Sequence, residues 1–132
     1  MAINATGVTA LLQVYDMRKS VAWYCDKLGF QIVEKYEPDG HLYWAMLKLG
    51  GAIVMLNAKF EDDMRPATAP PNTGHNDVTL YFGCNDVDAA YAHVQQKGLK
   101  VAPPQVTRYG MKQLTIPDPD GFDLCFQQPS KH

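Results

Sequence analysis

Residues 8–16 read VTALLQVYD, and residues 78–86 read VTLYFGCND. Each stretch is rich in apolar and β-favouring residues and ends in an aspartate, so each predicts a strand that leads into a helix N-cap. The two stretches begin and end alike and lie in one register, 70 residues apart along the chain. They therefore predict that one structural unit occurs twice.

Apolar side chains recur at helical spacing after each of the two aspartates, which predicts a helix in each unit. Gly29 ends the first helix and Gly98 ends the second, because a left-handed C′ position favours a residue without a Cβ atom. The two apolar stripes consist of Met17, Val21, Tyr24 and Leu28, and of Val87, Ala90, Tyr91 and Val94.

Three further strands are expected in each unit, which makes each unit β-α-β-β-β and the fold class α+β. Residues 59–74 lack periodicity and are rich in acidic residues and prolines, which indicates a linker or surface loop. We expect a single domain over residues 1–132, with unit one at about 7–58, the linker at about 59–76 and unit two at about 77–128. The further strands fall at 30–36, 42–49 and 52–57, and at 99–106, 111–116 and 122–127.

The composition argues against two classes of partner, nucleic acids and anionic membranes. With 46% hydrophobic residues, 20% charged residues and a net charge of −2, the chain has no strong electrostatic attraction to nucleic acid or to an anionic membrane. Cys25, Cys84 and Cys125 are scattered and odd in number, which favours reduced thiols over a disulfide framework. No secretory signal is recognisable at the N-terminus. We therefore expect a cytoplasmic protein.

Several short motifs carry a family resemblance. They are Val14-Tyr15-Asp16 with Ser20 and Trp23-Tyr24, then Lys27-Leu28-Gly29-Phe30, Asn85-Asp86-Val87-Asp88-Ala89-Ala90, Tyr109-Gly110-Met111 and Asp118-Pro119-Asp120-Gly121. In this order they resemble the glyoxalase/bleomycin-resistance/dioxygenase superfamily, also called the vicinal-oxygen-chelate superfamily. The aromatic-Gly-Met turn is most similar to the bleomycin-resistance branch.

The resemblance implies a fold and a site. The two tandem units would form a curved, mixed, eight-stranded sheet around a concave cavity, and the protein would be a homodimer. Enzymes of the family hold a divalent metal there through four side chains, usually His or Gln, Glu, His and Glu. The matching positions in this chain are Thr9, Met55, Thr79 and Cys125.

These four side chains are a poor ligand set for a hard or borderline cation. We therefore expect no metal, no cofactor and no catalytic residue of the family type. A rescued metal site built from His75, Asp123 and Cys125 is an alternative. Cys125 as a nucleophile would need a nearby base, and a buried thiol is the simpler interpretation.

Strand alternation predicts which side chains join the four positions in the cavity. In the third strand, Trp44 with Met46 is one choice of parity, and Tyr43 with Ala45 is the other. The expected ligand-binding residues are Thr9, Leu11, Gln13, Trp44, Met46, Met55, Thr79, Tyr81, Tyr109, Met111, Asp123 and Cys125. Such a lining is mostly apolar and aromatic and suits a small organic ligand.

Three functions follow from this interpretation. The first is a metal-free protein that binds, and in one version sequesters, a small molecule such as a drug. The second is a lyase, isomerase or dioxygenase-type enzyme of the same superfamily, with a rescued metal site or with Tyr81, Tyr109 or Asp123 as acid or base. The third is a noncatalytic interaction domain, which a solid core without a cavity would favour.

Overall fold

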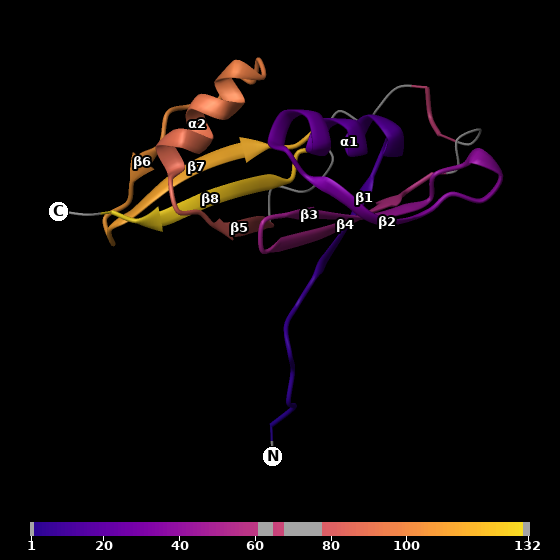
Figure 1. Ribbon diagram of the computed structural model, residues 1–132, viewed down its shortest axis with the longest axis horizontal. Helices are drawn as coiled ribbons and strands as arrows, with labels where there is room; N and C mark the ends of the chain where they lie inside the picture. Colours follow the sequence, from indigo (N-terminus) through magenta and orange to yellow (C-terminus); the bar gives the residue numbers. More distant parts are fainter. Residues whose placement is uncertain (1, 61–64, 68–77, 131–132) are drawn as a thin grey trace.

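The computed structural model describes residues 2–60, 65–67 and 78–130. Its elements follow the β-α-β-β-β order twice (Figure 1), which confirms the α+β class and the tandem units. The first unit contains β1 (Ala10–Val14), α1 (Met17–Trp23), the π-helix η1 (Tyr24–Leu28), β2 (Gln31–Tyr36), the 3₁₀-helix η2 (Pro38–Gly40), β3 (Trp44–Leu49) and β4 (Ala52–Ala58). The second contains β5 (Thr79–Gly83), α2 (Val87–Gln96), β6 (Gln105–Val106), β7 (Met111–Pro117) and β8 (Asp123–Pro129).

Hydrogen bonding divides the eight strands into two mixed sheets of four. The order is β1-β4-β3-β2 in the first sheet and β5-β8-β7-β6 in the second. The first strand of each unit pairs in parallel with the last, and the other neighbours are antiparallel. The eight strands expected in one curved sheet thus form two mixed sheets of four, and no ladder joins these sheets among the described strands.

The two predicted helix caps are present. Asp16 Oδ1 accepts a hydrogen bond from the backbone N–H of Lys19 at 3.2 Å. Asp86 Oδ1 accepts the equivalent bond from Ala89 at 2.9 Å. Both carboxylates satisfy an N–H group that the first helical turn leaves without a partner. Gly29 has a φ of 91°, in the left-handed region that the sequence predicted for the end of the first helix.

The first helix differs from a regular α-helix in its second half. Residues 24–28 form the π-helix η1, and Phe30 N donates to the carbonyl of Tyr24, 3.1 Å away. The wider turn places both Tyr24 and Leu28 in the core. Helical periodicity predicted these buried positions correctly, but it does not distinguish an α-turn from a single π-turn.

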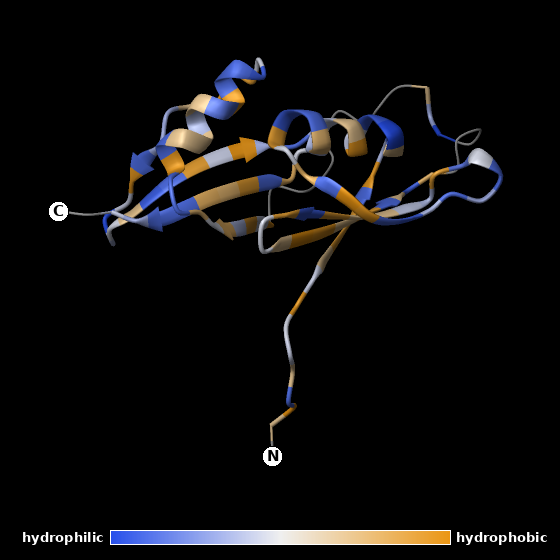
Figure 2. Cartoon of the chain, in the orientation of Figure 1, coloured by the Kyte–Doolittle hydropathy of each residue, from blue (hydrophilic) through white to orange (hydrophobic). Residues whose placement is uncertain are grey.

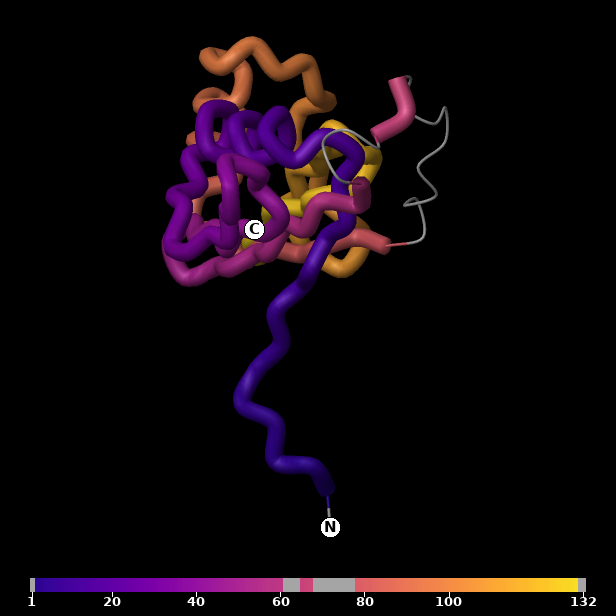
Figure 3. Tube along the Cα trace, turned by 90° about the vertical axis from the view of Figure 1, so that its right-hand side faces the viewer, coloured from indigo at the N-terminus to yellow at the C-terminus, as the bar shows by residue number. Residues whose placement is uncertain are grey.

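The helices cover one face of the two sheets. Figure 1 shows α1 and α2 on the same side of the strands, and Figure 3 shows the chain before β1 extending away from the body. β4 lies inside the first sheet and is almost entirely hydrophobic in Figure 2. Among the described residues, no helix is long and apolar enough to cross a membrane.

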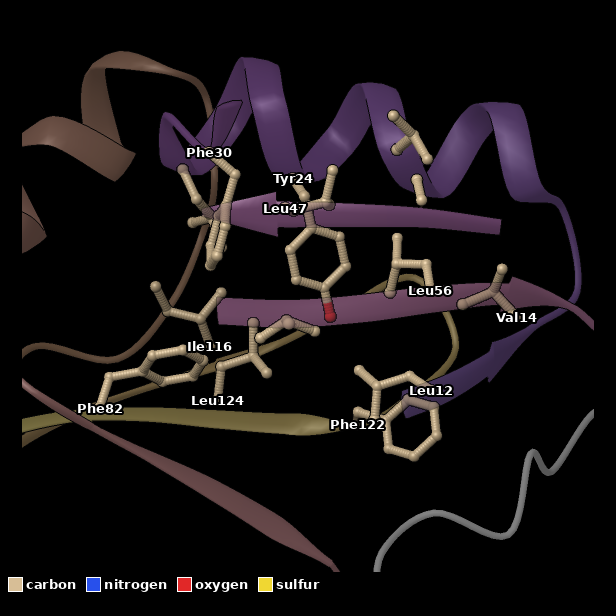
Figure 4. Close-up of a cluster of buried hydrophobic side chains, with 14 of the residues drawn as sticks. Leu12, Val14, Tyr24, Phe30, Leu47, Leu56, Phe82, Ile116, Phe122 and Leu124 are labelled. Atoms are coloured by element: carbon tan, nitrogen blue, oxygen red, sulfur yellow. The ribbon is translucent and has the colours of Figure 1, made fainter. Parts of the chain in front are cut away.

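The two units share one hydrophobic core beneath the helices (Figure 4). Phe30 of unit one packs edge-on against Phe82 of unit two, with ring centroids 6.3 Å apart. Phe82 in turn stacks on Phe126 at 4.7 Å. Edge-to-face and offset-stacked pairs of this kind add to the stabilisation from buried area, so the rings hold the units together.

Candidate functional site

The face of each sheet opposite the helices carries the candidate site. Alternation along β1 and β4 buries Leu12, Val14, Val54 and Leu56 under α1 and turns the intervening side chains outward. The outward set includes large apolar groups: Leu11 is 46% exposed, Ile53 is 42% exposed and Tyr81 of β5 is 59% exposed. An exposed apolar surface of this kind is typical of a binding site.

An open groove of about 930 Å³ lies between the two units, and its lining includes Phe82 and Phe126 of the shared core as well as outward-facing side chains. Its walls come from the start of β1, the β3–β4 turn with the first part of β4, and the whole of β5. Ile53 and Tyr81 are two of its larger side chains. This volume is in the range of pockets that accept a drug-sized organic molecule.

The structure places the predicted ligand residues in three environments. Thr79 and Tyr81 line the groove. Eight others lie on the outward faces of the strands or just outside strand ends: Thr9, Leu11, Gln13, Trp44, Met46, Met55, Tyr109 and Asp123. The parity of β3 is settled by Ala45, which is fully buried in the core, so Trp44 and Met46 face outward and Tyr43 does not belong to this set. Met111 begins β7 and is half-buried.

Cys125 is only 2% exposed, although it shares the outward parity of β8. Tyr81 and Thr115 occupy the paired positions on either side of it. Burial raises the pKa of the Cys125 thiol, a hydrogen bond with the Thr115 side chain partly offsets this rise, and the negative charge of Asp123 adds to it. The thiol therefore stays protonated near neutral pH, which disfavours a nucleophilic role.

The four positions equivalent to the family's metal ligands do not fit a metal ion. Thr9, Met55, Thr79 and Cys125 supply two hydroxyls, a thioether and a protonated thiol, whereas Zn²⁺ and related cations prefer imidazole, carboxylate or thiolate. In the described part of the chain, no three His, Cys, Asp or Glu side chains gather as a metal-binding group. His75, the first residue of the alternative metal site, lies outside the described residues.

A buried carboxylate network, which was not predicted from the sequence, joins the two units. Tyr24 is fully buried, and its hydroxyl donates to Asp118 Oδ2 at 2.6 Å. Asp118 Oδ1 also accepts the backbone N–H groups of Asp120 and Phe122. Burial raises the pKa of Asp118, and it raises the pKa of Tyr24 far above its usual value. The Asp-Pro-Asp-Gly motif marked this loop, but only the tertiary structure shows its partner.

A second feature is a set of carboxamides on the outward faces, of which only Gln13 was among the expected ligand-binding residues. Asn57 Nδ2 donates to Gln13 Oε1 at 3.2 Å in unit one, and Gln113 Nε2 donates to Gln127 Oε1 at 3.0 Å in unit two. Asn57 and Gln127 occupy equivalent positions under the 70-residue shift. Strand alternation could have shown that these amides share a face.

Comparison with known proteins gives this architecture a family. Residues 5–126 match the profile of the Glyoxalase/Bleomycin resistance protein/Dioxygenase superfamily. The chain belongs to this superfamily. A similar protein, the uncharacterized protein YaeR of Escherichia coli (strain K12), is 32% identical over 111 residues, which cover 83% of this chain and 84% of YaeR.

Two further relatives have functional names, and these names differ. A probable lactoylglutathione lyase of Synechocystis sp. (strain ATCC 27184 / PCC 6803 / Kazusa) is 27% identical over 123 residues, covering 91% of this chain and 92% of the relative. The crystal structure of TnmS3, an antibiotic binding protein from Streptomyces sp. CB03234, is similar with a TM-score of 0.70 and 27% identity. That likeness covers 98% of this chain and all of TnmS3.

Proposed function

We propose that this protein binds a small organic molecule in the groove between its two units, without a metal ion. The observation that carries the proposal is the open groove, with Ile53 and Tyr81 on its walls. An apolar ligand that packs against these side chains would displace water from their surfaces and from its own. This loss of exposed apolar area favours binding. The poor ligand set at the four family positions supports a binding role over metal-assisted chemistry.

The likeness to TnmS3 supports the same proposal. TnmS3 is an antibiotic binding protein, and its likeness to this chain covers nearly the full length of both. A protein that holds a drug tightly lowers its free concentration, and sequestration of this kind needs no catalytic group. We therefore propose drug or toxin sequestration in the cell as the physiological form of binding.

We further propose that two copies of the chain form the complete site. The helices cover only one face of the sheets (Figure 1). The opposite face keeps exposed apolar side chains such as Leu11, Ile53 and Tyr81. Trp44 and Met46 lie on this face but outside the groove of the single chain. A second copy on this face would bring both side chains towards a ligand and cover the apolar surface.

The direct test uses N-phenyl-1-naphthylamine, a neutral aromatic dye that becomes fluorescent in apolar pockets. We expect saturable dye binding by the wild-type protein and binding at least about tenfold weaker in Tyr81→Ala, since the side chain offers a large aromatic contact in the groove. Val106→Ala is the matched control, because Val106 is similarly exposed but lies outside the groove. Equal dye affinity in all three proteins would place the ligand elsewhere.

A second candidate is a lyase or isomerase, which the likeness to the probable lactoylglutathione lyase favours. The metal-dependent form of that function would need a metal ligand outside the four family positions, and His75 is the first residue to consider. The discriminating measurement is plasma mass spectrometry of protein purified without chelators and then loaded with Zn²⁺, Ni²⁺, Mn²⁺ or Fe²⁺. Near-stoichiometric retention that His75→Ala abolishes would favour the enzyme, whereas loss of every metal on desalting would favour metal-free binding.

A further inference from the structure

The carboxamide cluster of unit two has unused hydrogen-bonding capacity. Gln113 Nε2 donates to Gln127 Oε1 at 3.0 Å and lies 3.4 Å from the hydroxyl oxygen of Tyr109. Within the described residues, no protein group bonds to Gln127 Nε2 or to Gln113 Oε1. Two amides joined by one hydrogen bond leave a donor on one side chain and an acceptor on the other, whichever amide is the donor.

The space beside these groups is empty. Gln127 pairs with Gly83 of β5, and a Cβ atom built at Gly83 would meet nothing within 4 Å. The equivalent position of unit one holds Gln13, whose side chain occupies the corresponding space there and bonds to Asn57. Only unit two therefore presents its carboxamides next to a gap, and Gly83 is also part of the groove wall.

The gap lies at a defined distance from the aromatic part of the groove. Tyr81 and Gly83 share one face of β5, two residues apart. Two residues along a strand span about 6.6 Å, which is close to the length of a naphthalene ring system. A ligand whose ring packs on Tyr81 could thus place a polar substituent over Gly83, in reach of the two amides.

We propose that Gln113 and Gln127 recognise a neutral ligand group that carries a donor and an acceptor side by side, such as a carboxamide or a lactam. This inference rests on the proposed binding function and specifies its ligand chemistry. The free Nε2 of Gln127 donates to the carbonyl of that group, and Gln113 Oε1 accepts from its N–H. A carboxylate meets the same donor but sets its negative charge against the Gln113 oxygen, and a ketone leaves that oxygen unpaired.

The experiment compares three probes with one ring system: 2-naphthamide, 2-acetylnaphthalene and 2-naphthoate. Equilibrium dialysis against wild-type protein should show 2-naphthamide binding about tenfold or more tightly than the other two, because only the amide satisfies both free groups. In Gln127→Met the preference should disappear while 2-acetylnaphthalene still binds. Gln95→Met, on the exposed side of α2, is the control and should keep the wild-type preference.

A second variant tests the gap without removing a polar group. Gly83 has no positive φ, so Gly83→Val should fold normally while its side chain fills the space beside Gln127. It should weaken 2-naphthamide binding about tenfold or more. Equal affinities for the amide and the ketone in the wild type, or full amide affinity in Gly83→Val, would overturn amide recognition and leave the binding function standing. Absence of binding by all three probes would overturn both.

Discussion

The hydroxyl of Tyr24 makes one of the contacts between the two units. It lies in a fully buried side chain on η1 of unit one (Figure 4) and donates to Asp118, which is in the loop between β7 and β8 of unit two. A buried hydrogen bond to a carboxyl group contributes more than one between neutral partners, and removal of one partner leaves the other unsatisfied. This contact should therefore contribute measurably to folding.

We expect Tyr24→Phe to lower the free energy of unfolding by about 1–3 kcal/mol, because the variant keeps the ring but leaves Asp118 Oδ2 without its donor. Urea denaturation followed by circular dichroism measures this difference. Tyr36→Phe is the control, since Tyr36 is 60% exposed on β2, and it should change stability by less than about 0.5 kcal/mol. Equal effects of the two variants would show that the buried bond contributes little.

The raised pKa of Asp118 predicts a pH dependence of stability. Because the pKa in the folded state is above that in the unfolded state, the folded state holds the proton more strongly. The associated stabilisation is fully present below the unfolded pKa of about 4 and is lost as pH rises through the folded pKa. In Asp118→Asn, which has no proton to lose, this loss should be absent.

We therefore expect the stability of Asp118→Asn, relative to the wild type, to increase as pH rises from about 4 towards 7. The asparagine can still accept the two backbone N–H groups through Oδ1 and can offer its amide to the Tyr24 oxygen. Urea denaturation of both proteins at several pH values gives the comparison. A constant difference between the two curves would contradict the assigned titration.

At the scale of elements, the helix cap formed by Asp86 gives a testable prediction. Asp86→Ala removes the acceptor for the N–H of Ala89 and should lower the free energy of unfolding by about 1 kcal/mol. Asp86→Asn keeps an oxygen at the same place and should recover most of that loss. Thermal and urea unfolding of the three proteins test the cap, and an Asn variant as unstable as the Ala variant would argue against it.

Elements governed by local chemistry could be predicted from the sequence. Asp16, Asp86 and Gly29 act within a few residues, so their roles as helix start and stop were correct. The π-turn of η1 could not be predicted, since it depends on how Tyr24 and Leu28 fit a core made by both units. For β3, periodicity allowed two parities, and burial of Ala45 decided between them.

The candidate site was less predictable than the fold. Strand alternation placed the outward residues, but whether they meet in a groove depends on the arrangement of the two sheets. Thr79 and Tyr81 lie in the groove, whereas Trp44 and Met46 lie outside it. The gap at Gly83 is relevant to binding only because the fold pairs Gly83 with Gln127, which is 44 residues away in the sequence.

At the scale of the whole molecule, the uncovered sheet faces predict association of two copies. We expect sedimentation velocity to show a dimer for the wild type and a monomer for Ile53→Arg, because a charge on this face would lose its hydration in the interface. Val106→Arg is the matched control, since Val106 is also exposed but has the opposite parity on β6. A monomeric wild-type protein would contradict the dimer, and a dimeric Ile53→Arg would place the interface elsewhere.

The bond between Tyr24 and Asp118 also has a consequence for synthesis of the chain. A ribosome produces unit one first, and the partner of Tyr24 follows 94 residues later. Until then the first unit lacks the acceptor for this hydroxyl, and until residue 82 has been added it also lacks the aromatic neighbour of Phe30. The nascent half therefore reaches its final packing only when almost the whole chain has been translated. A truncated product that ends in the linker would lack both contacts and would be less stable than the complete protein.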